Sequence, residues 1–402
     1  MNIKNAVVGQ SGGPTAAINS TLAGVIKGSL EKSDCIKTLY GMKNGIKGFM
    51  REDIVNLSDI FAEDDKIRIL CQTPSAYLGS CRFKLTEDEQ IKTVFELFEK
   101  YNIGYFFYIG GNDSMDTVMK LSNSKYNNGV KIIGLPKTID NDLAITDHCP
   151  GFGSSAKYIA TIVSEVTRDT YCYDIQSVTI IEIMGRNAGW LTASAKLATV
   201  NGSHSPDLIY LPEKPFDINK FLADISKKLE HHKNVVVAVS EGIKTPDGKY
   251  IAASDTLLKE DKFGHSQLGG AGKVLETVIA EKLKVKVRSI ELNTPQRCAS
   301  HIASKTDIDE SVSMGNAAVN AALNGETGKM MVFKRINSNP YECKIECANI
   351  NDIANKEKIV PDEFITEDGN FVTQAFIDYA LPLIQGELDV EYINGLPRHL
   401  CL

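Results

Sequence analysis

Short apolar runs alternate with amphipathic stretches along most of the chain. Such runs are typical of strands that are buried on both faces of a parallel sheet. They predict strands at residues 5–9, 67–70, 105–109, 131–135, 177–183, 208–211, 234–239 and 285–292. The stretches between them predict helices at residues 16–30, 87–101, from about 115, at 151–170, up to about 198, at 274–283 and up to about 323.

The predicted strands and helices alternate in two series, which predicts the α/β fold class. The first series ends near residue 142, and the second begins near residue 177. Each series predicts one doubly wound, Rossmann-like sheet with helices on both faces. Ligands bind such sheets beyond the carboxyl ends of the strands, so the loops that follow the strands are candidates for chemistry.

The loop at residues 136–142 has the sequence Pro-Lys-Thr-Ile-Asp-Asn-Asp and follows a predicted buried strand. A lysine suits a phosphate group, and an aspartate suits a proton or a metal ion. Asp and Asn are also ordinary residues of solvated turns. The loop alone therefore leaves a functional site and a simple turn equally open.

Two further turns join a predicted strand to a predicted helix. Residues 10–15 and 110–114 carry paired glycines with polar neighbours. This arrangement directs backbone N–H groups toward a phosphate at a helix N-terminus. Each turn alone is also explained by tight packing, and Asp113 and Ser114 by helix capping. Because both turns and the 136–142 loop belong to one series, we expect them to converge on one crevice.

Composition and charge limit the possible functions. The chain has 402 residues, of which 43% are hydrophobic and 24% charged, and a net charge of −7. The negative charge disfavours nucleic-acid binding. No apolar run approaches the roughly 20 residues that a membrane helix needs, and the start lacks the pattern of a signal peptide. Nine scattered cysteines predict free thiols in a reducing cytoplasm.

Taken together, the strand-end loops resemble those of the phosphofructokinase family. The matching strings stand in the family's order and cover about the first 320 residues. They are Ser-Gly-Gly at 11–13, Leu-Gly-Ser-Cys-Arg at 78–82, Gly-Gly-Asn-Asp-Ser at 110–114, the 136–142 loop, Met-Gly-Arg-Asn-Ala-Gly-Trp at 184–190, Ser-Glu-Gly at 240–242 and the segment from Arg288 to Arg297. Single strings are unspecific, but the set is highly specific.

The resemblance implies two domains with the active site in the cleft between them. Residues 1–151 with 296–345 would bind the phosphoryl donor, and residues 152–295 with 346–402 the sugar phosphate. The implied reaction is phosphoryl transfer to the 1-hydroxyl of fructose 6-phosphate. ATP-dependent members typically carry glycine where Asp113 and Lys137 stand here, which implies pyrophosphate as the donor. The Asp113 side chain would occupy the space of a nucleotide α-phosphate and repel it.

The resemblance also implies roles for single residues. The catalytic set would be Asp140 as general base with Lys137, Asp113 and Thr138. The donor ligands would be Gly12, Gly13, Arg82 and Ser114. The sugar-phosphate ligands would be Thr138, Asp140, Asp142, Met184, Gly185, Arg186, Glu241, Arg288, Thr294 and Arg297. Mg²⁺ would bind with Asn112, Asp113 and Asp142. Because Arg288 would reach a neighbouring subunit, a homodimer or homotetramer is expected.

Three positions depart from the family's pattern. Asn112 stands where the family usually has an aspartate that is associated with the metal ion. An amide is a neutral ligand, so this position gives less support for a metal site than a carboxylate would. Ser177 replaces an arginine that contacts the sugar phosphate. Thr294 replaces a histidine.

Three other functions remain open from the sequence. An ATP-dependent kinase would share the fold, but Asp113 and Lys137 argue against it. A non-catalytic sugar-phosphate sensor would be expected to have lost Asp140, which is present. The NAD and lipid kinases have a turn similar to residues 110–114 but would not be expected to carry the later arginines. Residues 244–287, with their glycine-rich loop at 264–272, and the last 80 or so residues give no chemical signal.

Overall fold

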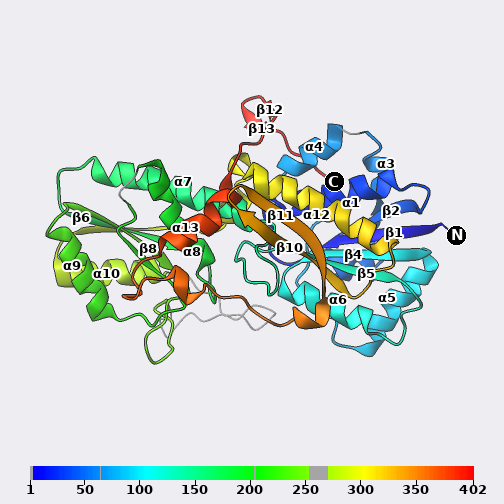
Figure 1. The fold of residues 1–402 in the computed structure, drawn as a ribbon, viewed down its shortest axis with the longest axis horizontal. Coiled ribbons are helices and arrows are strands. Elements are labelled where there is room, and N and C mark those ends of the chain that lie inside the picture. Colours follow the sequence, from blue (N-terminus) through cyan, green and yellow to red (C-terminus); the bar gives the residue numbers. More distant parts are fainter. Residues whose placement is uncertain (1–2, 64, 203–204, 253–269) are drawn as a thin grey trace.

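The computed structural model describes residues 3–63, 65–202, 205–252 and 270–402. It confirms the predicted α/β class. Two separate sheets, each between layers of helices, form the two lobes of an elongated molecule (Figure 1). A two-stranded ribbon near the C-terminus forms the third, smallest sheet.

The larger sheet contains seven strands in the order β11-β10-β5-β4-β1-β2-β3. Its inner strands run parallel, and each edge strand runs antiparallel to its neighbour. The strands are β1 (Lys4–Gln10), β2 (Ile36–Met42), β3 (Ile54–Asn56), β4 (Ile103–Gly110), β5 (Lys131–Pro136), β10 (Lys329–Ser338) and β11 (Tyr341–Asn349).

Helices cover both faces of the larger sheet, because successive strand residues point to opposite sides. Ala6 and Val8 pack with α1 (Ile18–Glu31) and α12 (Lys305–Leu323). Val7 belongs to the opposite core. The helices of that opposite core are α2 (Gly45–Phe49), α5 (Asp88–Lys100) and α6 (Asn112–Ser122).

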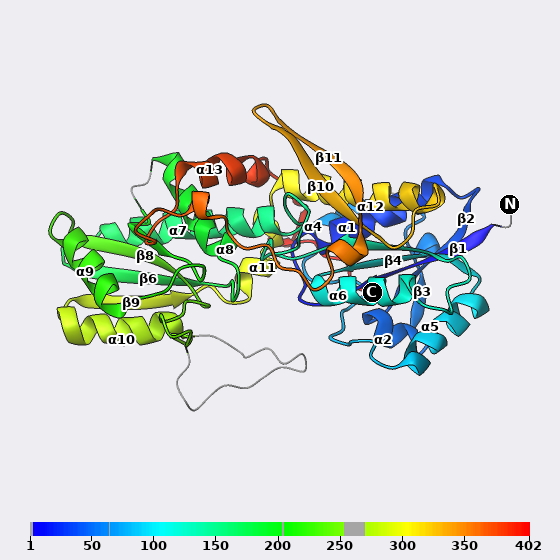
Figure 2. The same ribbon diagram turned by 60° about the horizontal axis from the view of Figure 1, so that its bottom comes forward.

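The smaller sheet is entirely parallel, in the order β7-β8-β6-β9. Its strands are β6 (Ser177–Ile183), β7 (Leu208–Tyr210), β8 (Asn234–Ser240) and β9 (Lys286–Glu291). One face packs on α7 (Phe152–Tyr171), α8 (Trp190–Ala193), η1 (Ser194–Asn201) and α13 (Gln374–Ala380). The other face packs on α9 (Ile218–Leu229) and α10 (Ala271–Leu283) (Figure 2).

Short elements complete the described chain. They are α3 (Leu57–Ile60), α4 (Asp65–Gln72), α11 (Pro295–Cys298), η2 (Ser300–Ile302), η3 (Ile350–Asp352), η4 (Asp362–Phe364), η5 (Leu381–Ile384), β12 (Tyr392–Ile393) and β13 (Leu396–Pro397). Across the described residues, no helix is long and apolar enough to cross a bilayer. All nine cysteines are free thiols.

The structure corrects two predicted elements. Residues 67–70 form part of helix α4 and not a strand, because a four-residue apolar run fits a buried helical turn equally well. Helix α6 begins at Asn112, and Gly111 is its N-cap, so Asp113 and Ser114 lie inside the first turn. Most of the predicted glycine-rich loop, residues 264–269, lies outside the described residues.

A buried histidine joins the segment after the 136–142 loop to helix α12. The two ring nitrogens of His148 lie 2.9 Å from carboxylate oxygens of Asp147 and Glu310, and the ring stacks on Phe333. Arg335 also pairs with Asp147, at 3.0 Å. Burial disfavours a charged imidazole, but the hydrogen bonds to both carboxylates raise the pKa of His148 above its usual value.

We predict that this cluster makes the stability of the protein depend on pH. Because the folded-state pKa of His148 is raised, its contribution is complete below the unfolded-state pKa of about 6.5 and is lost as the pH rises through the folded-state pKa. A difference of one between the two pKa values is equivalent to about 1.4 kcal/mol of stability. Urea unfolding between about pH 6 and pH 10 should therefore show this loss in the wild type and not in His148→Gln.

His399→Gln is the matched control, because His399 is exposed near the C-terminus. It should keep the pH dependence of the wild type. An equal pH dependence in the wild type and His148→Gln would contradict the role given to His148.

Candidate active site

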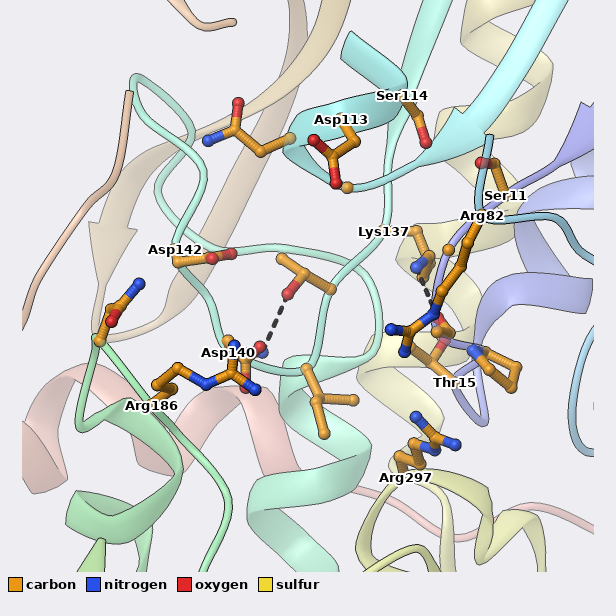
Figure 3. A pocket seen from close by; sticks show the side chains of 18 of the residues that line it. Ser11, Thr15, Arg82, Asp113, Ser114, Lys137, Asp140, Asp142, Arg186 and Arg297 are labelled. Atoms are coloured by element: carbon orange, nitrogen blue, oxygen red, sulfur yellow. Dashed lines mark hydrogen bonds between the residues drawn. The ribbon is translucent and has the colours of Figure 1, made fainter. Parts of the chain in front are cut away.

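One cavity of about 720 Å³ is lined by residues from both lobes (Figure 3). Loops after β1, β4 and β5 contribute one side, and loops after β6 and β8 contribute the other. The predicted site residues that line it are Gly12, Gly13, Arg82, Asn112, Asp113, Ser114, Lys137, Thr138, Asp140, Asp142, Met184, Arg186, Glu241 and Arg297. Most of the site predicted from the sequence is therefore gathered in one place.

The turns of the larger sheet are held together by direct hydrogen bonds. Gly12 has a positive φ of 76°, which lets the chain turn sharply after β1. The Ser80 hydroxyl donates to the Gly12 carbonyl at 2.6 Å, and the Gly12 N–H donates to the Cys81 carbonyl at 3.2 Å. The loop that carries Arg82 is thereby fixed against the first turn.

Lys137 lies at the centre of this side of the cavity. Its side chain is buried, and its amine donates to the carbonyl of Gly13 at 2.5 Å. Burial lowers the pKa of Lys137 to about 8, and the carboxylates of Asp140 and Asp142 act in the opposite direction. Arg82 and Arg297 point into the same side (Figure 3). This concentration of cations suits a polyanion such as a phosphate group.

Two carboxylates of the 136–142 loop face the cavity next to these cations. The Asp140 N–H donates to the Thr138 hydroxyl at 3.0 Å, which fixes the turn before the carboxylate. Burial raises the pKa of Asp140 to about 7, and the negative charges of Asp142 and Glu241 add to the rise. Burial also raises the pKa of Asp142. A carboxylate with a pKa near 7 suits a general base at neutral pH.

The smaller sheet supplies the opposite wall of the cavity. Arg186 follows β6, and its Nε is buried without a hydrogen-bond partner. Glu241 follows β8, and burial raises its pKa to about 7. Gly185 does not line the cavity, but its N–H donates to Glu241 Oε1 at 3.4 Å. This wall offers a cation and an acceptor for a polar ligand.

Three of the residues predicted to bind the sugar phosphate are not together in one chain. Arg297 lines the cavity beside the first turn, with Nη1 3.2 Å from where a Cβ on Gly13 would lie. Arg288 lies on β9 outside the cavity and pairs with Asp169 at 3.2 Å. Thr294 is exposed just before α11 and does not line the cavity either.

The residues predicted to hold a metal are engaged with protein groups. Asn112 Oδ1 accepts the N–H of Asn355 at 2.7 Å, and its Nδ2 donates to the carbonyl of Lys356 at 3.2 Å. Asp113 pairs with Lys84 at 2.9 Å. Within the described residues, no group of three or more His, Cys, Asp or Glu side chains is placed to hold a metal ion.

Sequence reasoning missed a contribution from the C-terminal part of the chain. Asn355 and Glu357 line the cavity, although no signal marked the last 80 or so residues. Lys84 and Asn187 also line it and were not predicted. Lys84 and Asn187 lie next to or within the recognised strings and could have been proposed on that ground. The C-terminal pair could not, because only tertiary folding brings it to the cavity.

The fold and the cavity define a two-domain α/β enzyme of the phosphotransferase class. The phosphofructokinase family model matches residues 5–322. The chain belongs to the phosphofructokinase family.

Named relatives match over nearly the full length. The pyrophosphate–fructose 6-phosphate 1-phosphotransferase of Halomonas elongata is 41% identical, with 98% of this chain and 95% of that protein covered. The protein of the same name from Methylococcus capsulatus is 40% identical, with 100% and 96% covered. The crystal structure of the pyrophosphate-dependent phosphofructokinase of Nitrosospira multiformis superposes with a TM-score of 0.90 at 39% identity, with 99% of this chain and 96% of that chain covered.

We predict that Asn112 anchors the C-terminal segment and does not control metal affinity. Asn112→Ala should lower the free energy of unfolding by about 1–3 kcal/mol, because two backbone groups lose their partner. The magnesium concentration for half-maximal activity should stay close to that of the wild type.

Asn123→Ala is the matched control at the other end of α6, where the amide bonds only the exposed side chain of Asn351. Its effect on stability should stay within about 0.5 kcal/mol. A large rise in the magnesium requirement of Asn112→Ala, with unchanged stability, would make Asn112 a metal ligand instead.

Proposed function

We propose that this chain transfers a phosphoryl group from pyrophosphate to the 1-hydroxyl of fructose 6-phosphate, giving fructose 1,6-bisphosphate and phosphate. The observation that carries the proposal is the cavity itself. Lys137 and Arg82 lie on one side of it and Arg186 on the other, with Asp140 between them, and Glu241 also lines it (Figure 3). The names of the relatives that match over the whole chain support the same reaction.

Asp140 is the general base in this proposal. Its carboxylate accepts the proton of the sugar's 1-hydroxyl while the hydroxyl oxygen attacks the terminal phosphorus of pyrophosphate. The bond from that phosphorus to the bridging oxygen breaks, and phosphate leaves. Thr138 holds the turn before Asp140 and faces the moving phosphoryl group. A positioned base typically contributes about 10²–10⁴-fold to the rate.

Lys137 and Arg82 bind the donor in this proposal, together with the backbone at Gly12 and Gly13 and with Ser114. Phosphoryl transfer asks a protein mainly for positioning and for neutralisation of charge. Lys137 is already buried, so bringing a phosphate to it costs little further desolvation of the amine. The leaving phosphate gains negative charge as the bond breaks, and the amine favours that change.

Asp113 sets the choice of donor. The carboxylate and its partner Lys84 stand on the cavity wall beside Ser114. Pyrophosphate is short enough to end before Asp113 and Lys84. A nucleotide is longer and would have to extend past the negative charge of Asp113. ATP is therefore disfavoured by both shape and charge.

The sugar is held by Met184, Arg186 and Glu241, and its 6-phosphate by Arg297 and Arg288. Thr294 belongs to the same substrate-binding set. Because Arg288 and Thr294 lie outside the cavity of their own chain, we propose that Arg288 acts in the site of a second subunit of a homodimer or homotetramer. Thr294 is exposed before α11, and the side chain of Arg288, paired with Asp169, is 40% exposed, so both reach the surface where such a contact would form.

Mg²⁺ fits the proposed reaction. The carboxylates of Asp113 and Asp142 line the cavity, and Mg²⁺ takes one or two carboxylates plus phosphate oxygens and keeps water. Asp142 and Asp113 would hold it together with the pyrophosphate. When bound, it would neutralise charge on the phosphates.

We propose residues 1–151 with 296–354 as the donor domain and 152–295 with 355–390 as the sugar domain. The boundary expected at residue 345 moves, because β11 (Tyr341–Asn349) belongs to the larger sheet and Ile350 and Ile353 pack in its core. The pairing of β10 with β5 and the packing of α13 on the core of the smaller sheet support this division. Gln72 bonds the main chain at Glu391 and Arg398, so the last residues go with the donor domain rather than the sugar domain. We place the reaction in the cytoplasm, which the free thiols support.

We predict that Asp140→Asn lowers kcat by about 10²–10⁴-fold, because the amide cannot accept the proton. Fructose 6-phosphate should still bind, as measured by calorimetry without donor, because the sugar ligands of the opposite wall are intact. A kcat close to that of the wild type would remove Asp140 from the role of base.

We predict that Asp113→Gly with Lys137→Gly raises turnover with ATP relative to turnover with pyrophosphate. The double variant removes the charge that repels a nucleotide and the amine that favours a small donor. Lys92→Gly with Glu96→Gly is a matched control, because it removes an exposed ion pair from helix α5, whose residues do not line the cavity. An unchanged ratio of the two activities in Asp113→Gly/Lys137→Gly would contradict the account of donor choice.

A further inference from the structure

The segment at residues 355–358 crosses between the two lobes, in the part of the chain that follows η3 (Figures 1 and 2). It contacts three of the loops that line the cavity. Asn355 bonds Asn112 at the start of α6, and Glu357 accepts from Asn187 Nδ2 at 3.2 Å. The N–H of Lys358 donates to the carbonyl of Asp142 at 2.7 Å.

The side chain of Lys358 continues behind the 136–142 loop. Its amine donates to the backbone carbonyls of Asp147 at 2.7 Å and Thr146 at 3.0 Å, and lies 3.4 Å from the side-chain oxygen of Asn141. An ammonium group has three protons, and these three oxygens account for all of them. None of the ion pairs among the described residues involves Lys358, and burial lowers its pKa. The buried amine therefore holds uncharged oxygens in place, namely two backbone carbonyls and one side-chain amide oxygen.

These oxygens belong to the two ends of one loop, residues 141–147, which begins directly after Asp140. Asn141 at its start and Ile145 near its end both have positive φ, at 54° and 71°. Asparagine tolerates this conformation, but a β-branched isoleucine does so only where the surroundings enforce it. Tyr379 adds a second support, because its hydroxyl accepts from Asn141 Nδ2 at 2.8 Å and donates to the Asp147 carbonyl at 2.7 Å.

We propose that Lys358 is a positioning residue for phosphoryl transfer, because its amine and its N–H fix the 141–147 loop and thereby aim Asp140 and Asp142 into the cavity. The inference rests on the proposed function. Lys358 touches neither substrate nor the reacting atoms, since it lies behind the loop and does not line the cavity. Its effect is therefore on the geometry of the reaction and not on substrate affinity.

Lys358→Met tests the inference, because methionine fills similar space without donors. Misplacing a reacting group by a small distance costs about 100-fold in rate, so kcat should fall by about that factor while KM for each substrate stays nearly constant. Lys356→Met is the matched control, since Lys356 is exposed two residues earlier on the same segment and should keep the kcat of the wild type.

Two further measurements separate positioning from general damage. Amide hydrogen exchange without ligands should speed up at residues 141–147 in Lys358→Met and not in Lys356→Met. If Lys358→Met does not fold, Tyr379→Phe decides, because it removes one support of the same loop conservatively. It should lower kcat by a smaller factor, again without a change in KM.

A kcat for folded Lys358→Met equal to that of the wild type would overturn the inference, as would unchanged exchange at residues 141–147. If only Tyr379→Phe folds, an unchanged kcat overturns it. Failure of the proposed function can be told apart from failure of this inference. In the first case the wild type itself would not convert pyrophosphate and fructose 6-phosphate. The exchange measurement would still test the inference, because it needs no turnover.

Discussion

The structure depends on the alignment of two sheets, one entirely parallel and one with parallel inner strands, so that the carboxyl ends of the parallel strands meet at one cavity. The parallel strands end there, and loops follow them. These loops carry the polar side chains that can bind a ligand. Here the loop after β5 directs Lys137, Asp140 and Asp142 toward the loops that follow β6 and β8, and the loop that carries Arg82 is fixed against the turn after β1. The cores on both faces of each sheet hold these strand ends in place.

The same arrangement creates an electrostatic cost that substrates relieve. Burial lowers the pKa of Lys137 to about 8 and raises those of Asp140 and Glu241 to about 7, because charges are disfavoured away from water. Arg186 keeps a buried Nε without a partner. Anions brought to the lysine, and hydroxyls brought to the carboxylates, supply the partners that the cavity lacks. Charge complementarity of this kind favours small phosphorylated ligands.

The sequence predicted those parts of the site that lie within one short stretch of the chain. The 136–142 loop and the turns at residues 10–15 and 110–114 converge as expected, because each follows the carboxyl end of a parallel strand in the same sheet. The α/β class was also predicted correctly, because the alternation of apolar runs with amphipathic stretches can be read from neighbouring residues alone. The strand predicted at residues 67–70 is wrong, because a short apolar run carries too little pattern to separate strand from helix.

What the sequence could not predict depends on contacts between distant segments. Asn355 and Glu357 reach the cavity only because β10 and β11 extend the larger sheet and return the chain to the cleft. Lys358 bonds residues more than 200 positions earlier, and no local pattern announces such a contact. The family string that contains Arg288 was recognised, but its place outside the cavity is a property of the single folded chain.

The most direct test of the central claim is the formation of fructose 1,6-bisphosphate by the purified chain with fructose 6-phosphate and Mg²⁺, given pyrophosphate or ATP in parallel. The account predicts rapid product formation with pyrophosphate and little with ATP. Turnover with ATP alone would contradict the donor assignment. Absence of turnover with either donor would contradict the assignment of the cavity as a phosphoryl-transfer site.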